Sequence, residues 1–270
     1  MTTVVEPSTN AGPQDPTTGG AADFRITHGK PVFSRRDLVV PVMCALIGVV
    51  LYLNVERQSL DSIEANVLNF DSLWRATTEH IRLSFTIAFL VVLIAVPLGV
   101  VVTRQRTQRL APAVLTLGNV GQAAPSLGLL ALFGLFFVGF WAVTLILTAY
   151  AVLSVLRNTI VGLQGVDAGM LDAARGMGMS PTAILFRVEL PTAVPVIGAG
   201  VRTALVLAVG TVPLGYALDA GGLGLPLFSA IKTNRPLVTL TVAVMIALLA
   251  LLLDWFGGIL QRAATPRGIR

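Results

Sequence analysis

Residues 161–191 read VGLQGVDAGMLDAARGMGMSPTAILFRVELP, the only long segment in the second half of the chain that is not strongly apolar. Apolar residues at helical spacing predict a first helix over residues 166–175, with Asp167 where negative charge suits a helix N-terminus. Gly176 and Gly178 supply the backbone freedom for a turn. The segment therefore begins as a helix that leads into a tight turn.

A second helix is predicted to follow this turn. Ser180 has the character of an N-cap, and Pro181 suits the first helical position. The apolar stripe of this helix consists of Ile184, Leu185, Val188 and Leu190. Pro191 is expected to end it, because proline interrupts a helix interior. Two helices held against a membrane body would leave a free surface that can dock into a groove of another protein.

The composition of the 270 residues indicates a membrane protein. Hydrophobic residues make up 54% and charged residues only 12%, whereas a soluble domain is about a quarter charged. The mean hydropathy is +0.80, and the apolar runs are long enough to cross a bilayer as helices. The pI near 10.1 is explained by basic residues between the spans, so no nucleic-acid partner is expected.

The chain divides into a membrane core and an additional N-terminal part. A cleaved signal peptide is the alternative to a retained first span, but its n-region would be unusually long. The expected organisation is a disordered cytoplasmic tail over 1–36, an extra transmembrane helix over 37–55, an extracytoplasmic segment over 56–80, a membrane core over 81–260 that contains the loop 161–191, and a cytoplasmic tail over 261–270.

About six transmembrane helices are expected, which makes the fold class all-α. Residues 62–73 are expected to form a short surface helix between the first two spans. Glycines and Pro125 weaken or break the helix in the third apolar region. Residues 215–236 are too rich in glycine to cross and are expected to form a re-entrant or interfacial piece on the outer side. The apolar regions are 38–53, 81–103, 111–138, 141–156, 192–214 and 237–260.

The basic residues predict the orientation of the chain. Fourteen of the 19 Lys and Arg residues fall on one side of the membrane when six spans are drawn with both ends inside. This is the bias of cytoplasmic segments, and it predicts that the loop 161–191 is cytoplasmic. The remaining five, on the outer side, are Arg57, Arg75, Arg82, Lys232 and Arg235.

The loop resembles the EAA loop of ABC-transporter permease subunits. The family pattern is E-A-A, three residues, G, nine residues and I-x-L-P. This chain has Asp172-Ala173-Ala174, then Gly178, then Val188-x-Leu190-Pro191, with Asp for Glu and Val for Ile. The resemblance implies a type I importer permease fold with a cytoplasmic coupling loop. The residues expected to couple the chain to an ATPase are Met170, Leu171, Asp172, Ala173, Ala174, Arg175, Gly178 and Met179.

The resemblance extends over roughly residues 73–260. LRNT (156–159), the AARGMGMS run, Gln122-x-x-Pro125-Ser126-Leu127 and AGGLG (220–224) are similar to permeases that import osmoprotectants such as glycine betaine, choline and carnitine. A methionine or other amino-acid importer is the alternative within the transporters. A membrane scaffold or membrane-embedded enzyme that recruits a soluble partner is the alternative outside them.

The resemblance also implies the partners of the chain. Two ATPase subunits would bind ATP and Mg²⁺, a second permease would be a copy or a paralogue, and an extracytoplasmic binding protein would deliver substrate. No cofactor, ATP site or catalytic activity is expected in this chain itself. Small residues such as Ala173, Ala174 and Gly178 would let the loop approach a partner closely, and Asp172 and Arg175 would fix the register through polar contacts.

The lining of the translocation path is predicted less directly. Polar groups at membrane depth require water or protein around them, which favours Asn119, Gln122, Pro125 and Ser126 as path residues. Helix–helix packing is the alternative for the same residues.

The remaining ionisable and glycine-rich features suggest no further site. Asp254, in the last span, is favoured as half of a tertiary ion pair, or as a side chain that reaches the interface. No metal site is expected, since His28 and His80 are predicted on opposite sides, and AGGLG lacks the ending of a phosphate loop. No aromatic cage for a quaternary amine is visible in the sequence.

Overall fold

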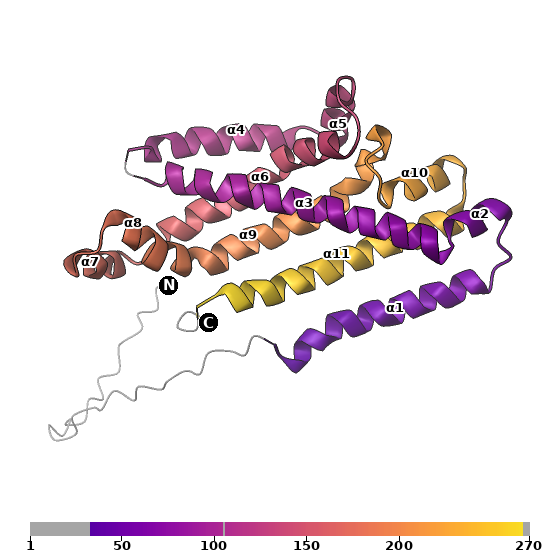
Figure 1. The fold of residues 1–270 in the computed structure, drawn as a ribbon, viewed down its shortest axis with the longest axis horizontal. Coiled ribbons are helices and arrows are strands. Elements are labelled where there is room, and N and C mark those ends of the chain that lie inside the picture. The colour runs from indigo at the N-terminus through magenta and orange to yellow at the C-terminus, as the bar shows by residue number, and fades with distance from the viewer. Residues whose placement is uncertain (1–32, 105, 267–270) are drawn as a thin grey trace, which may run out of the picture.

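The computed structural model describes residues 33–266 except residue 105. Every regular element within these residues is helical (Figure 1), which confirms the predicted all-α class. Most of the tail predicted over 1–36 and the end of the tail predicted over 261–270 lie outside the described residues.

The elements are, in chain order, η1 (Arg35–Leu38), α1 (Val39–Glu56), α2 (Ser62–Val67), α3 (Phe70–Val102), η2 (Gln108–Leu110), α4 (Ala111–Ala123), α5 (Ser126–Gly134), α6 (Phe140–Gln164), α7 (Ala168–Gly176), α8 (Pro181–Ile184), the π-helical turn η3 (Leu185–Glu189), α9 (Leu190–Thr211), η4 (Val212–Leu218), α10 (Gly224–Lys232) and α11 (Pro236–Ala264).

The core lies between long helices that pack side by side, α3 against α6, α6 against α9, and α9 against α11 (Figure 1). Apolar side chains four residues apart line one face of a helix, and this spacing joins α3 to α6. The contributing residues, all at most 1% exposed, are Leu83, Ile87 and Val91 on α3 and Val143, Leu147 and Ala151 on α6. A second buried cluster joins α9 and α11 through Val209, Val242, Leu249 and Leu253.

Five helical stretches among the described residues are long and apolar enough to cross a membrane. The third of the six predicted regions, 111–138, is instead broken into α4 and α5, with Pro125 at the break. A helix of 13 residues such as α4 is about 20 Å long, shorter than the about 30 Å hydrocarbon core. The predicted break at Pro125 is confirmed, whereas Gly118, Gly121 and Gly128 lie within α4 and α5.

The second span begins much earlier than predicted. α3 starts at Phe70 rather than near residue 81, because the side chain of Asn69 caps it by accepting the Ser72 N–H at 2.8 Å. The predicted surface helix over 62–73 is accordingly only α2, and the residues after it belong to α3. The first turns of α3 carry polar side chains, so the hydropathy of the sequence does not indicate where this helix begins.

Pro191 does not end the second loop helix, contrary to the prediction. The helical path continues from α8 through η3 into α9, and Pro191 occupies the first turn of α9. The π-helical turn lies directly before Pro191 and changes the hydrogen-bond register where the proline N–H is missing. The second loop helix and the following span therefore form one helical stretch, Pro181–Leu218.

The additional helix α1 is held against α11 near both ends. At one end, the Trp255 indole N–H donates to the Asp37 carbonyl at 2.6 Å, and Arg262 forms an ion pair with the Asp37 carboxylate at 2.8 Å. At the other end, Arg235 pairs with Asp61 in the turn that leads from α1 to α2. Along its length α1 is largely exposed, as a lipid-facing helix would be.

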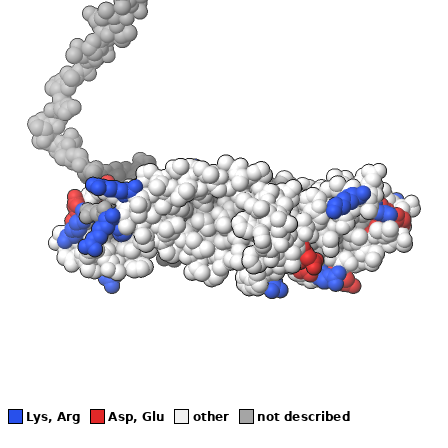
Figure 2. Space-filling model, turned by 90° about the horizontal axis from the view of Figure 1, so that it is seen from above, with Lys and Arg blue, Asp and Glu red and all other residues white. Residues whose placement is uncertain are grey.

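Charged side chains gather toward the two ends of the elongated body. On the face shown in Figure 2, the middle of the molecule carries no charged side chains. This distribution is typical of the part of a protein that lies within the membrane. α7 and α8 lie at one end, and α2 and α10 lie at the other (Figure 1). These are called the α7 end and the α10 end below.

Candidate functional site

The first loop helix, α7, begins at Ala168, two residues later than predicted, and Asp167 is its N-cap. One carboxylate oxygen of Asp167 accepts the Met170 N–H at 2.9 Å, satisfying a donor that has no partner within the helix. Asp172 and Arg175, which were expected to contact a partner protein, form an exposed ion pair with each other at 2.6 Å. An exposed pair of this kind contributes little to stability.

Gly178 closes α7 through a Schellman motif. The Gly178 N–H donates to the Arg175 carbonyl at 2.9 Å, and the Met179 N–H donates to the Ala174 carbonyl at 3.2 Å. The φ of Gly178 is +77°, a conformation that residues with a Cβ rarely adopt. The predicted turn is therefore confirmed, and this conformation gives a reason for glycine at residue 178.

One face of α7 is apolar and exposed. Met170, Ala173 and Met177 are spaced three and four residues apart, and the two methionines are 46% and 74% exposed. We call these three residues the loop face. Ala174 is 2% exposed, so its small side chain packs within the chain, and its role in coupling stays a prediction. Leu171 and Met179 are half-buried.

The loop is tied mechanically to the membrane helices. The hydroxyl of Ser180 accepts the Ala183 N–H at 3.3 Å and caps α8, as predicted. Where the helical path enters α9, Glu189 forms an ion pair with Arg104, which follows the end of α3, at 2.6 Å. The Glu189 side chain is only 14% exposed. The sequence indicated no role for this pair, since its members lie far apart in the chain.

The predicted path residues of α4 are bound to α6. The Asn119 side-chain oxygen accepts from the Arg157 guanidinium at 2.6 Å, and the Gln122 amide donates to the Tyr150 carbonyl at 3.0 Å. Both contacts fit the packing alternative, since they attach the short α4 to its neighbour. The path role of these two residues stays a prediction.

The other two predicted path residues lie at the break between α4 and α5. Pro125 is exposed in an extended conformation, and Ser126 starts α5. The four residues thus come from one pair of short helices. None of the four lines the cavity between α5 and α6, although Gly121 and Leu129 from the same region do.

The predicted tertiary ion pair of Asp254 is confirmed. Arg202 on α9 donates to both carboxylate oxygens of Asp254 on α11, at 3.1 Å and 2.6 Å. The Arg202 side chain lies across Gly257 and Gly258, where added Cβ atoms would come within 3.0 Å and 3.3 Å of it. The two glycines therefore make room for a bidentate pair between two spans.

His80 has a structural role that the sequence did not indicate. It is fully buried in α3, and its Nε2 lies 3.0 Å from the Val209 carbonyl. That carbonyl would normally accept from the N–H four residues later, but residue 213 is a proline and has none. An Nε2–H on His80 replaces the missing donor where α9 passes into η4. Pro213 was the available signal, but sequence alone could not identify its distant partner.

Residues 95–266 match the family model described as binding-protein-dependent transport system inner membrane component. The chain is 37% identical to the choline transport system permease protein OpuBB of Bacillus subtilis over 203 residues, which are 75% of this chain and 93% of that protein. It is 35% identical to the osmoprotectant import permease protein OsmW of Salmonella typhimurium over 220 residues, 78% of this chain and 100% of that protein.

The fold also has a solved counterpart. A chain of the MetNI methionine ABC transporter, in an inward-facing conformation, superposes with a TM-score of 0.64 at 27% identity, covering 72% of this chain and 96% of that one. The family model covers more than half of this chain, and the relatives align over nearly their full lengths. The chain belongs to the family of inner membrane permease components of binding-protein-dependent ABC transport systems.

Proposed function

We propose that the chain is the permease subunit of an ATP-driven importer of osmoprotectants such as glycine betaine, choline or carnitine. In this function the α7 end faces the cytoplasm, and the loop face docks into a groove on an ATPase subunit. The α10 end faces outward and meets the binding protein that delivers substrate. Two ATPase subunits bind ATP and Mg²⁺, and a second permease, a copy or a paralogue, completes the passage.

The observation that carries this proposal is the combination of an exposed apolar loop face with a continuous helical connection to a span. Docked methionine side chains would leave water, which is favourable in proportion to the area they bury. A displacement of the loop is then transmitted to α9 through the helical stretch Pro181–Leu218 and to α3 through the Arg104–Glu189 ion pair. Closure of the ATPase can thereby move α9 and α3 together.

The substrate class is supported by the names of the relatives. Relatives at 34–37% identity are choline, carnitine, glycine betaine or osmoprotectant permeases. The methionine alternative is supported only by the structural neighbour, at 27% identity. Family membership alone leaves both open, because one fold serves several substrates.

Uptake by cells tests the proposal. The chain is expressed with its ATPase and binding protein in a host without other osmoprotectant importers, and uptake of radiolabelled choline and glycine betaine is measured. We expect uptake that unlabelled osmoprotectants compete with and methionine does not. Uptake of radiolabelled methionine, with no uptake of either osmoprotectant, would establish the alternative substrate.

A further inference from the structure

We infer that a cavity at the α10 end binds a zwitterion, a small molecule with one carboxylate and one positive charge, and that Arg75 holds its carboxylate. The inference rests on the proposed function, since it gives the imported osmoprotectant a place on this chain. It also distinguishes among the osmoprotectants, because glycine betaine and carnitine carry a carboxylate that Arg75 can hold and choline does not.

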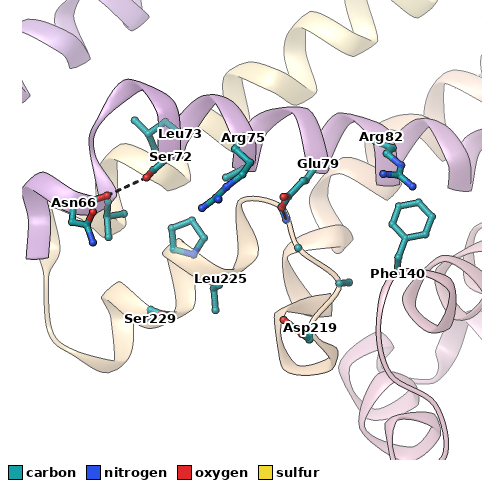
Figure 3. A pocket seen from close by; sticks show the side chains of 16 residues that line it. Asn66, Ser72, Leu73, Arg75, Glu79, Arg82, Phe140, Asp219, Leu225 and Ser229 are labelled. Carbon is teal, nitrogen blue, oxygen red and sulfur yellow. Dashed lines mark hydrogen bonds between the residues drawn. The ribbon is translucent and has the colours of Figure 1, made fainter.

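The cavity has a volume of about 720 Å³, within the range of about 300–1,000 Å³ that small-molecule sites occupy. One wall is a face of α3, the opposite wall is the connection from η4 to α10, and the end of α2 contributes a third side (Figure 3). Gly221 and Gly222 bring the connection close to α3, since a Cβ on Gly221 would lie 2.7 Å from a carboxylate oxygen of Glu79.

Side chains of both charges line this cavity. Arg75, Glu79 and Arg82 occupy positions i, i+4 and i+7 of α3, so they share one face of the helix. In Figure 3, Arg75 and Glu79 extend from α3 toward the connection from η4 to α10, which carries Asp219, and Arg82 extends toward Phe140. All four side chains belong to exposed residues, so a ligand that arrives from water can reach them.

Within the described part of the chain, none of these four side chains forms an ion pair. Arg82 lies over the ring of Phe140, with its guanidinium carbon 4.7 Å from the ring centroid. Glu79 accepts the Gly222 N–H at 2.9 Å with only one of its oxygens. The Arg75 guanidinium has no described hydrogen-bond partner and is the group left to hold a carboxylate.

Two other large cavities offer no comparable chemistry. One, of about 700 Å³, lies between α5 and α6 and is lined by aromatic and aliphatic side chains. The other, of about 390 Å³, contains Arg202 and Gln261, but Arg202 is paired with Asp254, and the Gln261 amide donates to the Pro195 carbonyl at 2.6 Å. Unpaired charges thus distinguish the cavity at the α10 end.

The balance of charges favours a zwitterion over a simple ion. A bare cation or a bare anion meets groups of its own charge as well as opposite ones here, so it finds a favourable partner at only one part of the site. A molecule with both charges can place its carboxylate at Arg75 and its ammonium near Glu79 and Asp219. Because these groups are exposed, each contact is weak, which suits a site that receives a substrate and passes it on.

Uptake measured on paired substrates tests the inference. The assembled transporter, with Arg75→Gln in this chain, is assayed with glycine betaine and with choline at concentrations below saturation. We expect glycine betaine uptake to fall about fivefold, the upper end for an exposed ion pair, and choline uptake to change by less than about twofold. Arg75→Lys should restore much of the loss, and Arg57→Gln, at the same end but outside the cavity, should have no effect.

Asp219→Asn supplies a second, independent variant. Asp219 has a φ of 55°, and asparagine tolerates this left-handed conformation, so the backbone is preserved. Both substrates carry the ammonium group, so we expect the uptake of both to fall by similar factors.

The results separate this inference from its rivals. An equal loss of both substrates in Arg75→Gln would overturn it and would indicate that Arg75 meets an acidic group of the binding protein. No loss of either substrate would overturn it as well. If the unmodified transporter imports neither osmoprotectant, the proposed function itself fails.

Discussion

Replacing Met177 with alanine tests whether the loop face is the docking surface for an ATPase. Met177 is 74% exposed, against 46% for Met170 on the same face. Full burial of a methionine contributes about 1.5–3 kcal/mol, so burying roughly three quarters of it on docking contributes about 1–2 kcal/mol. That difference weakens the affinity about 5- to 30-fold.

The measurement is equilibrium binding of the purified ATPase subunit to the permease in lipid nanodiscs. Met43→Ala is the matched control, because Met43 is also exposed, at 40%, but lies on the lipid-facing helix α1. We expect the control to bind like the unmodified chain. The reasoning would be refuted if Met177→Ala bound the ATPase with unchanged affinity while its fold and thermal stability stayed intact.

Three further predictions concern the α10 end. His80→Leu leaves a buried carbonyl without its donor, which costs about 1–3 kcal/mol and should lower the thermal unfolding temperature in detergent. Gly224→Ala would put a Cβ 2.3 Å from a backbone oxygen of η4, so the yield of folded protein should fall, whereas Gly210→Ala, with nothing within 4 Å, should be tolerated. The backbone N–H of Glu64 is the main cause that lowers the pKa of Asp61 from its usual 3.8. The stability that Asp61 gives α2 is therefore present above about pH 4 and is lost as the pH falls through the lowered pKa. Hydrogen exchange of the α2 amides, measured against pH, can follow this loss. Asp61→Asn should remove the pH dependence.

Local signals in the sequence were sufficient to predict the architecture of the loop. Asp167 and Ser180 cap the two helices, and Gly178 makes the turn, because each effect depends on residues within one helical turn. The break at Pro125 followed from the same kind of local reasoning. The length and hydropathy of the spans indicated the membrane class for an equally simple reason.

Features that depend on tertiary packing could not be predicted in this way. The sequence does not say which alanine of the pair faces inward, and the structure buries Ala174 and exposes Ala173. Pro191 was expected to end a helix, but a π-helical turn before it lets the helical path continue. His80 satisfies a carbonyl 129 residues away, a contact that no local pattern reveals.

The candidate path residues show the same limit. Asn119 and Gln122 were selected because polar groups at membrane depth need partners, and the structure gives each of them a partner on α6. The charged cavity at the α10 end was not recognised, because its walls come from segments far apart in the chain. In the sequence, its arginines indicate only the orientation of the chain.

ATP-driven transport in proteoliposomes tests the central claim most directly. The chain is reconstituted with its ATPase and binding protein, with ATP and Mg²⁺ on the side of the α7 end and radiolabelled glycine betaine on the other. The account predicts accumulation against a gradient that requires ATP hydrolysis, and that weakens when Met177 is replaced by alanine. Accumulation that is equal with a non-hydrolysable ATP analogue, or absent with every osmoprotectant, would contradict it.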